Sequence, residues 1–120
     1  MGTITENFSW EEFECKDGCG SDYVDIMLVN KLQRMRDILG YPLTVTSGVR
    51  CVEHNHAVGG KDNSAHVKGL AVDIAYEGSR ERFSLIATAI EVGFDRIGLG
   101  YDFIHLDIDK SKSSDVMWTY

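Results

Sequence analysis

Three residues of this 120-residue chain, His66, Asp73 and His105, have side chains and positions that could together bind a metal ion. Asp73 stands between Val72 and Ile74, and His105 also stands between two aliphatic residues. A carboxylate in an apolar strand must be paired, hydrogen-bonded or metal-bound, because burying an isolated charge is expensive. Two histidines and one carboxylate form a common zinc ligand set that leaves a fourth position for water. Such a water loses its proton near neutral pH and becomes a nucleophile.

The segments around these residues have the alternating pattern of β-strands. In residues 70–76 the aliphatic residues 70, 72 and 74 share one face, and the aspartate of the metal set lies on the other. In residues 103–108 the aliphatic residues likewise share one face, while His105 and Asp107 share the opposite one. His66 ends a glycine-rich loop seven residues before the aspartate. It can therefore fold back over the same sheet face.

Hydrophobic periodicity and turn residues predict the elements that must position these strands. The predicted elements are a short helix opened by a Ser9–Glu12 capping box, a helix over 23–39 stopped by Gly40, a strand over 43–46, a helix capped by Ser79 and closed by Gly93, and a strand over 96–99 that forms a hairpin with 103–108. Residues 50–69 are predicted to form a long ordered loop, a feature that is usually functional in a small domain. This order predicts an α+β domain with helices flanking a small, mainly antiparallel sheet.

Two of the predicted helices carry apolar residues at steps of three and four, the spacing of a buried helix face. In the helix over 23–39 these residues are Val24, Met27, Leu28, Leu32, Met35, Ile38 and Leu39. In the helix that Ser79 caps they are Phe83, Ile86, Ala87 and Ile90. We expect these two faces to pack on the sheet.

The length and composition predict one domain over residues 1–120. The chain is 43% hydrophobic and has a single proline, so it has enough apolar side chains for a core. It contains no apolar run near the roughly 20 residues that span a bilayer, so no membrane partner is expected.

The charge of the chain is acidic, with 12 Lys and Arg against 19 Asp and Glu and a net charge of −7. This balance argues against a nucleic-acid partner, because binding to a phosphate backbone depends on Lys and Arg. The first six residues have neither a basic stretch nor an apolar segment typical of a secretory signal. We therefore expect a protein that is cytoplasmic as synthesised and that reaches any external target by another route.

The chain contains three cysteines, Cys15, Cys19 and Cys51. An odd number of cysteines without a secretory signal is typical of reduced thiols rather than of a disulfide framework. Two interpretations stay open. The favoured one is that they are small buried or loop thiols. The other is that they form a second, structural zinc site together with His54 or His56.

The segment Ser64–Asp73 matches the pattern Ser-x-His-x-x-Gly-x-Ala-x-Asp. With this signature the chain resembles the zinc D-Ala-D-Ala peptidase superfamily, and in particular its small phage and bacterial domains. Further segments that resemble this branch are Thr46–Cys51, Asn55, Val58–Gly60 and Phe103–Asp107. The resemblance covers nearly the whole chain in order and implies the hedgehog/D-Ala-D-Ala peptidase fold.

The resemblance also implies roles for individual residues. His66, Asp73 and His105 match the zinc ligands of the family. Arg50 ends the Ser-Gly-x-Arg motif. Its planar, charged guanidinium group can bind a peptide carboxylate or a developing oxyanion. Ser64 lies two residues before the first ligand, where it would contact substrate or hydrogen-bond near that ligand.

The general base has more than one candidate. Related peptidases often carry an acidic residue three positions before the last histidine ligand, and Asp102 occupies that position. Strict alternation puts Asp102 on the face opposite His105, so this role requires a bulge or a twist. Asp107 lies on the correct face as an alternative base, or it orients the histidine. His54 and His56 are further candidates.

The resemblance implies a zinc metallopeptidase that hydrolyses peptidoglycan stem peptides, as a carboxypeptidase or an endopeptidase. Because the sequence shows neither a wall-binding module nor a secretory signal, we expect a phage lysis or virion protein that is released by another route. A second hypothesis is an inactive zinc-containing binding or virion structural module, as in the related hedgehog signalling domains. A third is a structural domain whose cysteines bind zinc and whose histidines belong to the core. The bond that is cut and the oligomeric state stay open.

Overall fold

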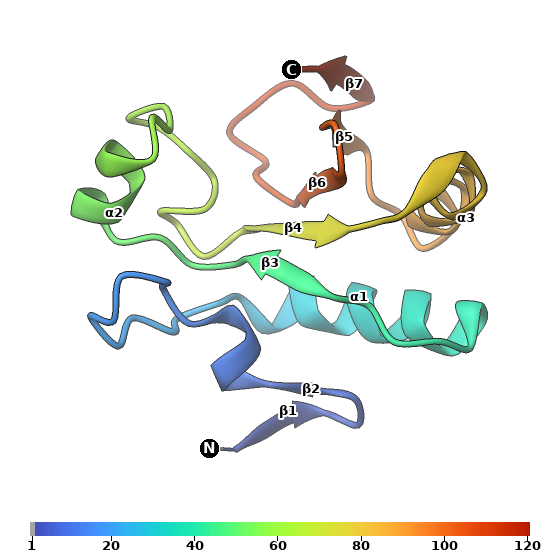
Figure 1. Cartoon of the computed structure of the whole chain (residues 1–120), viewed down its shortest axis with the longest axis horizontal. Coiled ribbons are helices and arrows are strands. Elements are labelled where there is room, and N and C mark those ends of the chain that lie inside the picture. Colours follow the sequence, from blue (N-terminus) through green and yellow to red (C-terminus); the bar gives the residue numbers. More distant parts are fainter. Residues whose placement is uncertain (1) are drawn as a thin grey trace.

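The computed structural model describes residues 2–120, so residue 1 of the predicted domain lies outside the described part. Figure 1 shows helices and a twisted sheet lying side by side. In chain order the elements are β1 (Thr3–Thr5), β2 (Phe8–Ser9), the 3-10 helix η1 (Trp10–Phe13), α1 (Ile26–Leu39), β3 (Val45–Ser47), α2 (Val52–Ala57), β4 (Ala71–Ala75), α3 (Gly78–Glu91), β5 (Arg96–Leu99), β6 (Phe103–Asp107) and β7 (Val116–Thr119). The predicted α+β class is confirmed.

The main sheet has five strands in the order β3-β4-β6-β5-β7. All neighbouring pairs are antiparallel except β5 and β7, which are parallel. In the central pair, Asp73 on β4 lies directly opposite His105 on β6. Residues opposite each other in such a pair project to the same side of the sheet. The pairing of the two strands therefore brings two of the predicted metal ligands together.

The other side of the central strands faces the hydrophobic core. The fully buried aliphatic residues there are Val72, Ile74, Ile104 and Leu106, as the alternation predicts. Helix α1 packs into the same core through Leu28, Leu32 and Met35. Its predicted start at residue 23 is wrong, because the Asp25 carboxylate accepts a hydrogen bond from Met27 N at 2.7 Å and caps the helix there. Its predicted end is confirmed, with Gly40 in the left-handed conformation.

The face that α3 buries agrees with the predicted one at Ile86, which packs against the core, and differs at the other predicted positions. The helix begins at Gly78 after Glu77, and Ser79 is not its cap. Its buried residues are Leu85, Thr88 and Ala89. Phe83 is instead 74% exposed, and Ile90 is exposed as well. Apolar residues at helical spacing lie on both faces of this helix. Contacts with α1 and β6 bury the face that carries Leu85 and Ala89.

Several short elements were not predicted. The β1–β2 hairpin has strands of three and two residues, and α2 occupies part of the segment 50–69 that was predicted as a loop. Strand β7 lies at the edge of the main sheet and pairs in parallel with β5, 20 residues earlier in the chain. Each element is shorter than the window in which hydrophobic periodicity is detectable. The predicted capping box at η1 is confirmed, with Ser9 N donating to Glu12 Oε2 at 2.8 Å.

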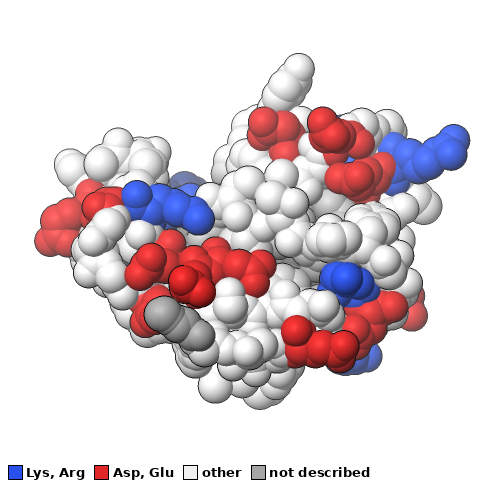
Figure 2. All heavy atoms as spheres, turned by 60° about the horizontal axis from the view of Figure 1, so that its bottom comes forward, with Lys and Arg blue, Asp and Glu red and all other residues white. Residues whose placement is uncertain are grey.

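The surface carries the acidic excess of the sequence. Figure 2 shows acidic side chains gathered in several groups on the side of the molecule that lies at the bottom of Figure 1, with fewer basic side chains between them. Among the described residues, no helix combines the length and the apolar character that a membrane crossing requires.

Candidate metal centre

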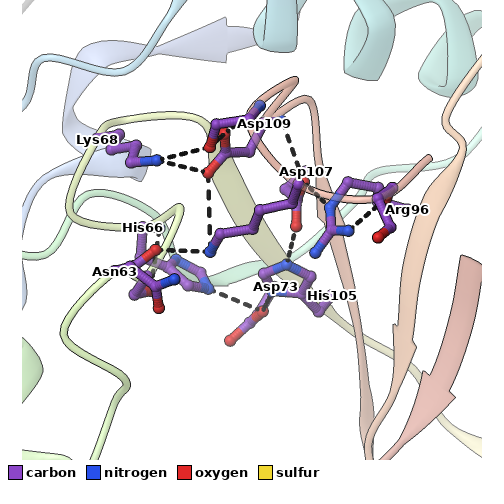
Figure 3. A network of polar contacts seen from close by, with 12 residues as sticks. Asn63, His66, Lys68, Asp73, Arg96, His105, Asp107 and Asp109 are labelled. Carbon is purple, nitrogen blue, oxygen red and sulfur yellow. Dashed lines mark hydrogen bonds and ion pairs between the residues drawn. The ribbon is translucent and has the colours of Figure 1, made fainter.

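The three predicted metal ligands lie close together on the side of the sheet that faces away from the hydrophobic core. His66 Nε2 lies 3.3 Å from Asp73 Oδ1, and His105 Nδ1 lies 3.2 Å from the same oxygen. The ligand atoms all lie within 4.8 Å of one another, and all three residues are buried. Figure 3 shows the two imidazoles directed at the carboxylate between them. The structure thus brings together two nitrogens and one oxygen, a donor set that zinc prefers.

The orientation of His66 is set by the backbone. Its Nδ1 lies 2.7 Å from the carbonyl oxygen of Gly48, which can only accept a hydrogen bond. Nδ1 therefore donates to this carbonyl oxygen, and Nε2 faces Asp73. A hydrogen bond to the second nitrogen of this kind is characteristic of metal-binding histidines.

The loop that carries His66 is held by two local features. Ser64 Oγ accepts a hydrogen bond from His66 N at 3.2 Å, one of the roles expected for this serine. Gly69 has a φ of 75°, and a Cβ there would lie 2.4 Å from the carbonyl oxygen of Tyr23. A side chain at Gly69 would therefore push the loop away from the segment that precedes α1.

His105 is oriented by Asp107. Its Nε2 lies 2.7 Å from Asp107 Oδ2, so the imidazole donates there and directs Nδ1 at Asp73. Asp107 Oδ1 accepts from Arg96 Nε at 2.7 Å and from Asp109 N at 3.1 Å. Both carboxylate oxygens are therefore engaged. This geometry corresponds to the orienting alternative for Asp107.

The pKa values follow from burial and from these contacts. Burial raises the pKa of Asp73, but hydrogen bonds and charge from His105 and His66 outweigh it and lower the pKa to about 2. Burial lowers the pKa of His105, but hydrogen bonds to Asp107 and Asp73 outweigh it and raise the pKa. Asp73 is thus anionic, and positive charge is favoured beside it. A divalent cation supplies that charge, so the three residues fit a zinc ion.

A second buried carboxylate ties the His66 loop to the segment after β6. Asp109 Oδ2 lies 3.0 Å from Lys68 Nζ and 3.7 Å from Lys112 Nζ, and Lys112 Nζ also donates to the carbonyl oxygen of Asn63 at 2.6 Å. Figure 3 shows these contacts beside the imidazoles. The network holds both sides of the His66 turn.

Arg50 lies at the wall of a cavity of about 610 Å³ that contains the three metal ligands. Its Nη2 is 3.6 Å from Asp73 Oδ2, and its side chain is 17% exposed. Hydrogen bonds of 3.3 Å to Ser47 and Asn55 fix the guanidinium. Ser64 lines the same cavity. Both residues predicted to bind substrate therefore border the space next to the metal ligands.

Arg96, Trp118 and Tyr120 are among the cavity residues that the sequence did not predict. In the β5–β6 hairpin Ile97 pairs with Leu106, so the next positions along the two strands bring Arg96 opposite Asp107. Trp118 comes from β7, with its ring centre 5.5 Å from that of His105, and Tyr120 follows it along the cavity wall. Alternating aromatic and β-branched residues near the end of the chain were the available signal.

The structure does not bring the other base candidates to the metal ligands. Asp102 is exposed in the turn before β6, and the pairing of β4 with β6 runs without the bulge that its predicted role requires. His54 and His56 lie on α2. None of the three lines the cavity. Among the described residues that do, the carboxylates are those of Asp73 and Asp107.

We expect Asp107→Asn to weaken zinc binding by about 10–100-fold, the usual effect of losing an outer partner of a metal-bound histidine. The amide cannot accept from both His105 and Arg96 with the strength of a carboxylate, and Arg96 loses its buried partner. Isothermal titration with zinc and thermal unfolding measure the two effects.

Asp109→Asn is the matched control, because this carboxylate is equally buried but contacts no imidazole. It should lower thermal stability with a smaller change in zinc affinity. Equal zinc affinity in the Asp107 variant and in the wild type would contradict the orienting role.

Two comparisons with known proteins extend these observations. A family model described as Peptidase M15 matches residues 6–107, which include all three metal-site residues. A zinc D-Ala-D-Ala carboxypeptidase from Streptomyces albus G is 44% identical over 73 residues. The matched segment covers 59% of this chain and 28% of the relative, so the chain spans less than two thirds of that protein.

Proposed function

The chain belongs to the peptidase M15 family, as the Ser64–Asp73 motif predicts, and from this we propose that it is a zinc peptidase acting on peptidoglycan stem peptides. The observation that carries the proposal is the convergence of His66, Asp73 and His105 beside a cavity that has room for a peptide. The similarity to a zinc D-Ala-D-Ala carboxypeptidase supports the substrate class.

Different residues of the site would have different roles in hydrolysis. His66, Asp73 and His105 would hold a zinc ion, and a bound zinc would supply an activated water and polarise the scissile carbonyl. Asp107 keeps His105 in the tautomer that directs Nδ1 at the site. Arg50 directs a fixed positive charge into the cavity, where it binds the terminal carboxylate of a peptide or the developing oxyanion.

The general base is assigned from the family resemblance, which favours Asp102. Asp102 directly precedes Phe103, a residue of the cavity wall, but does not itself line the cavity. Catalytic hydrogen bonds often tighten only when substrate is bound. We therefore retain Asp102 as the residue that takes the proton of the attacking water and returns it to the leaving amine.

Arg50→Ala should lower kcat/KM by roughly a hundredfold, the typical effect of removing one preorganised donor to a developing charge. Its effect on folding should be small, because Arg50 lies outside the hydrophobic core. Steady-state kinetics and thermal unfolding test this. Arg50→Lys should stay impaired, because lysine lacks the planar fork. Arg80→Ala, on the exposed start of α3, is the control and should keep full activity. Full activity in Arg50→Ala would remove this residue from the site.

The proposal is tested by incubating the zinc-loaded protein with purified muropeptides and identifying the products by mass. Loss of a terminal D-alanine indicates a carboxypeptidase, and cleavage of an internal bond indicates an endopeptidase. Zinc-loaded protein that binds muropeptides without cleaving them would favour the alternative, an inactive zinc-containing binding or virion structural module.

A further inference from the structure

Three thiols and one carboxylate meet at a second place on the molecule. This cysteine cluster consists of Cys15, Asp17, Cys19 and Cys51, and its four ligand atoms all lie within 4.8 Å of one another. The Asp17 carboxylate accepts hydrogen bonds from Cys15 Sγ at 3.2 Å and from Cys51 Sγ at 3.0 Å. None of the four residues lines the cavity of the metal centre. The cluster is therefore a separate site.

The spacing of these atoms fits a tetrahedral zinc ion. Zinc–thiolate bonds are about 2.3 Å long, which places sulfur atoms at tetrahedral corners roughly 3.8 Å apart. The four ligand atoms of the cluster, all within 4.8 Å of one another, lie close to this spacing. Thiolates select zinc over magnesium and calcium, which prefer oxygen ligands. A disulfide would use two of the three thiols and would leave the third thiol and the carboxylate without a role.

The backbone around the cluster supports thiolate ligands. Cys51 N donates to Cys15 Sγ at 3.4 Å, and His54 N donates to Cys51 Sγ at 3.3 Å. The amide of Cys19 donates to Asp17 Oδ1 at 2.9 Å. Backbone donors of this kind stabilise negative charge on ligand atoms and orient them.

We propose that the cysteine cluster binds a structural zinc ion through its three thiolates and the carboxylate of Asp17. All four positions are then protein ligands, which is the pattern of structural rather than catalytic zinc sites. The sequence suggested His54 or His56 as the fourth ligand. Neither imidazole belongs to the cluster, and Asp17 takes that position.

The zinc ion would connect two parts of the chain that support the catalytic site. Cys51 lies three residues after Gly48, whose carbonyl oxygen holds His66. On its other side this segment packs on η1, where a Cβ at Gly48 would lie 2.7 Å from Phe13 Cα. Cys15 follows Phe13 by two residues. The ion would thus fasten η1 to the segment that carries Gly48.

Metal counting tests the proposal on the full chain, loaded with zinc under reducing conditions and desalted. We expect two zinc ions per chain in the wild type. Cys19→Ser/Cys51→Ser should keep one ion, at the His66 centre, and His66→Ala/His105→Ala should keep the other. Cobalt loading adds a spectroscopic readout, because the three cysteines of the sequence all lie in the cysteine cluster. The thiolate-to-cobalt charge-transfer band should persist in the histidine variant and disappear in the cysteine variant.

Further variants keep the test decisive if the cysteine variant folds poorly. Asp17→Asn changes an exposed residue and should weaken the second zinc by about 10–100-fold or more, since even outer partners of a ligand have effects of this size. His54→Ala and His56→Ala are the controls and should keep both ions. A single zinc per wild-type chain that the His66→Ala/His105→Ala variant loses, no charge-transfer band, or thiols that react with a thiol reagent equally fast with and without zinc would each overturn the proposal.

Discussion

Replacing both His66 and His105 with alanine is expected to abolish hydrolysis and to remove the zinc ion held at this centre. The two imidazoles supply two of the three protein ligands, and Asp73 alone leaves too few for a zinc site. The expected stoichiometry falls by one ion per chain, measured by elemental analysis after desalting. Muropeptide cleavage, followed by mass spectrometry, should drop to background.

His54→Ala/His56→Ala is the matched control, because it removes two imidazoles of α2 that do not line the cavity. It should keep wild-type zinc content and activity. Circular dichroism establishes that each double variant is folded. A folded His66/His105 variant that holds as much zinc as the wild type would refute the ligand assignment.

Asp102→Asn should lower kcat by about 10²–10⁴-fold, the usual contribution of a positioned general base. The amide keeps the size of the side chain but cannot take the proton of the attacking water. Zinc affinity should stay unchanged, because Asp102 contacts none of the three ligands. Steady-state assays of muropeptide cleavage measure kcat, and zinc titration measures the zinc affinity.

The exposed carboxylate of Asp95, at the start of β5, provides the control for Asp102, and Asp95→Asn should be fully active. A fully active Asp102→Asn variant with normal zinc would end its assignment as the base. The proton acceptor would then be sought among the groups that line the cavity, beginning with Asp107. This outcome is distinct from that of Asp107→Asn, which should change metal affinity.

The chemistry of the metal centre was predictable from the sequence. Asp73 and His105 interrupt apolar alternation, and a polar residue at such a position needs a partner in any fold that buries the strand. The alternation also specified which side of β4 and β6 faces the core, because successive side chains of a strand point to opposite sides. The motif around His66 and Asp73 then indicated the family.

The local sequence was a weaker guide where two arrangements satisfied it equally. Helix α3 carries apolar residues on two faces, so its periodicity could not determine that Leu85 and Ala89, rather than Phe83 and Ile90, enter the core. That choice depends on contacts with α1 and β6, which lie far away in the chain.

Only the tertiary structure decided how the centre is supported. Gly48 comes from the loop after β3, Arg96 from the neighbouring strand β5, and Trp118 from β7. The parallel pairing of β7 with β5 is not predicted by any local sequence pattern. The tertiary structure likewise brings Asp17, and not the imidazole of His54, next to the three thiols. Residue types and local periodicity thus determined which side chains can bind metal. The three-dimensional packing of distant segments determined which groups orient them.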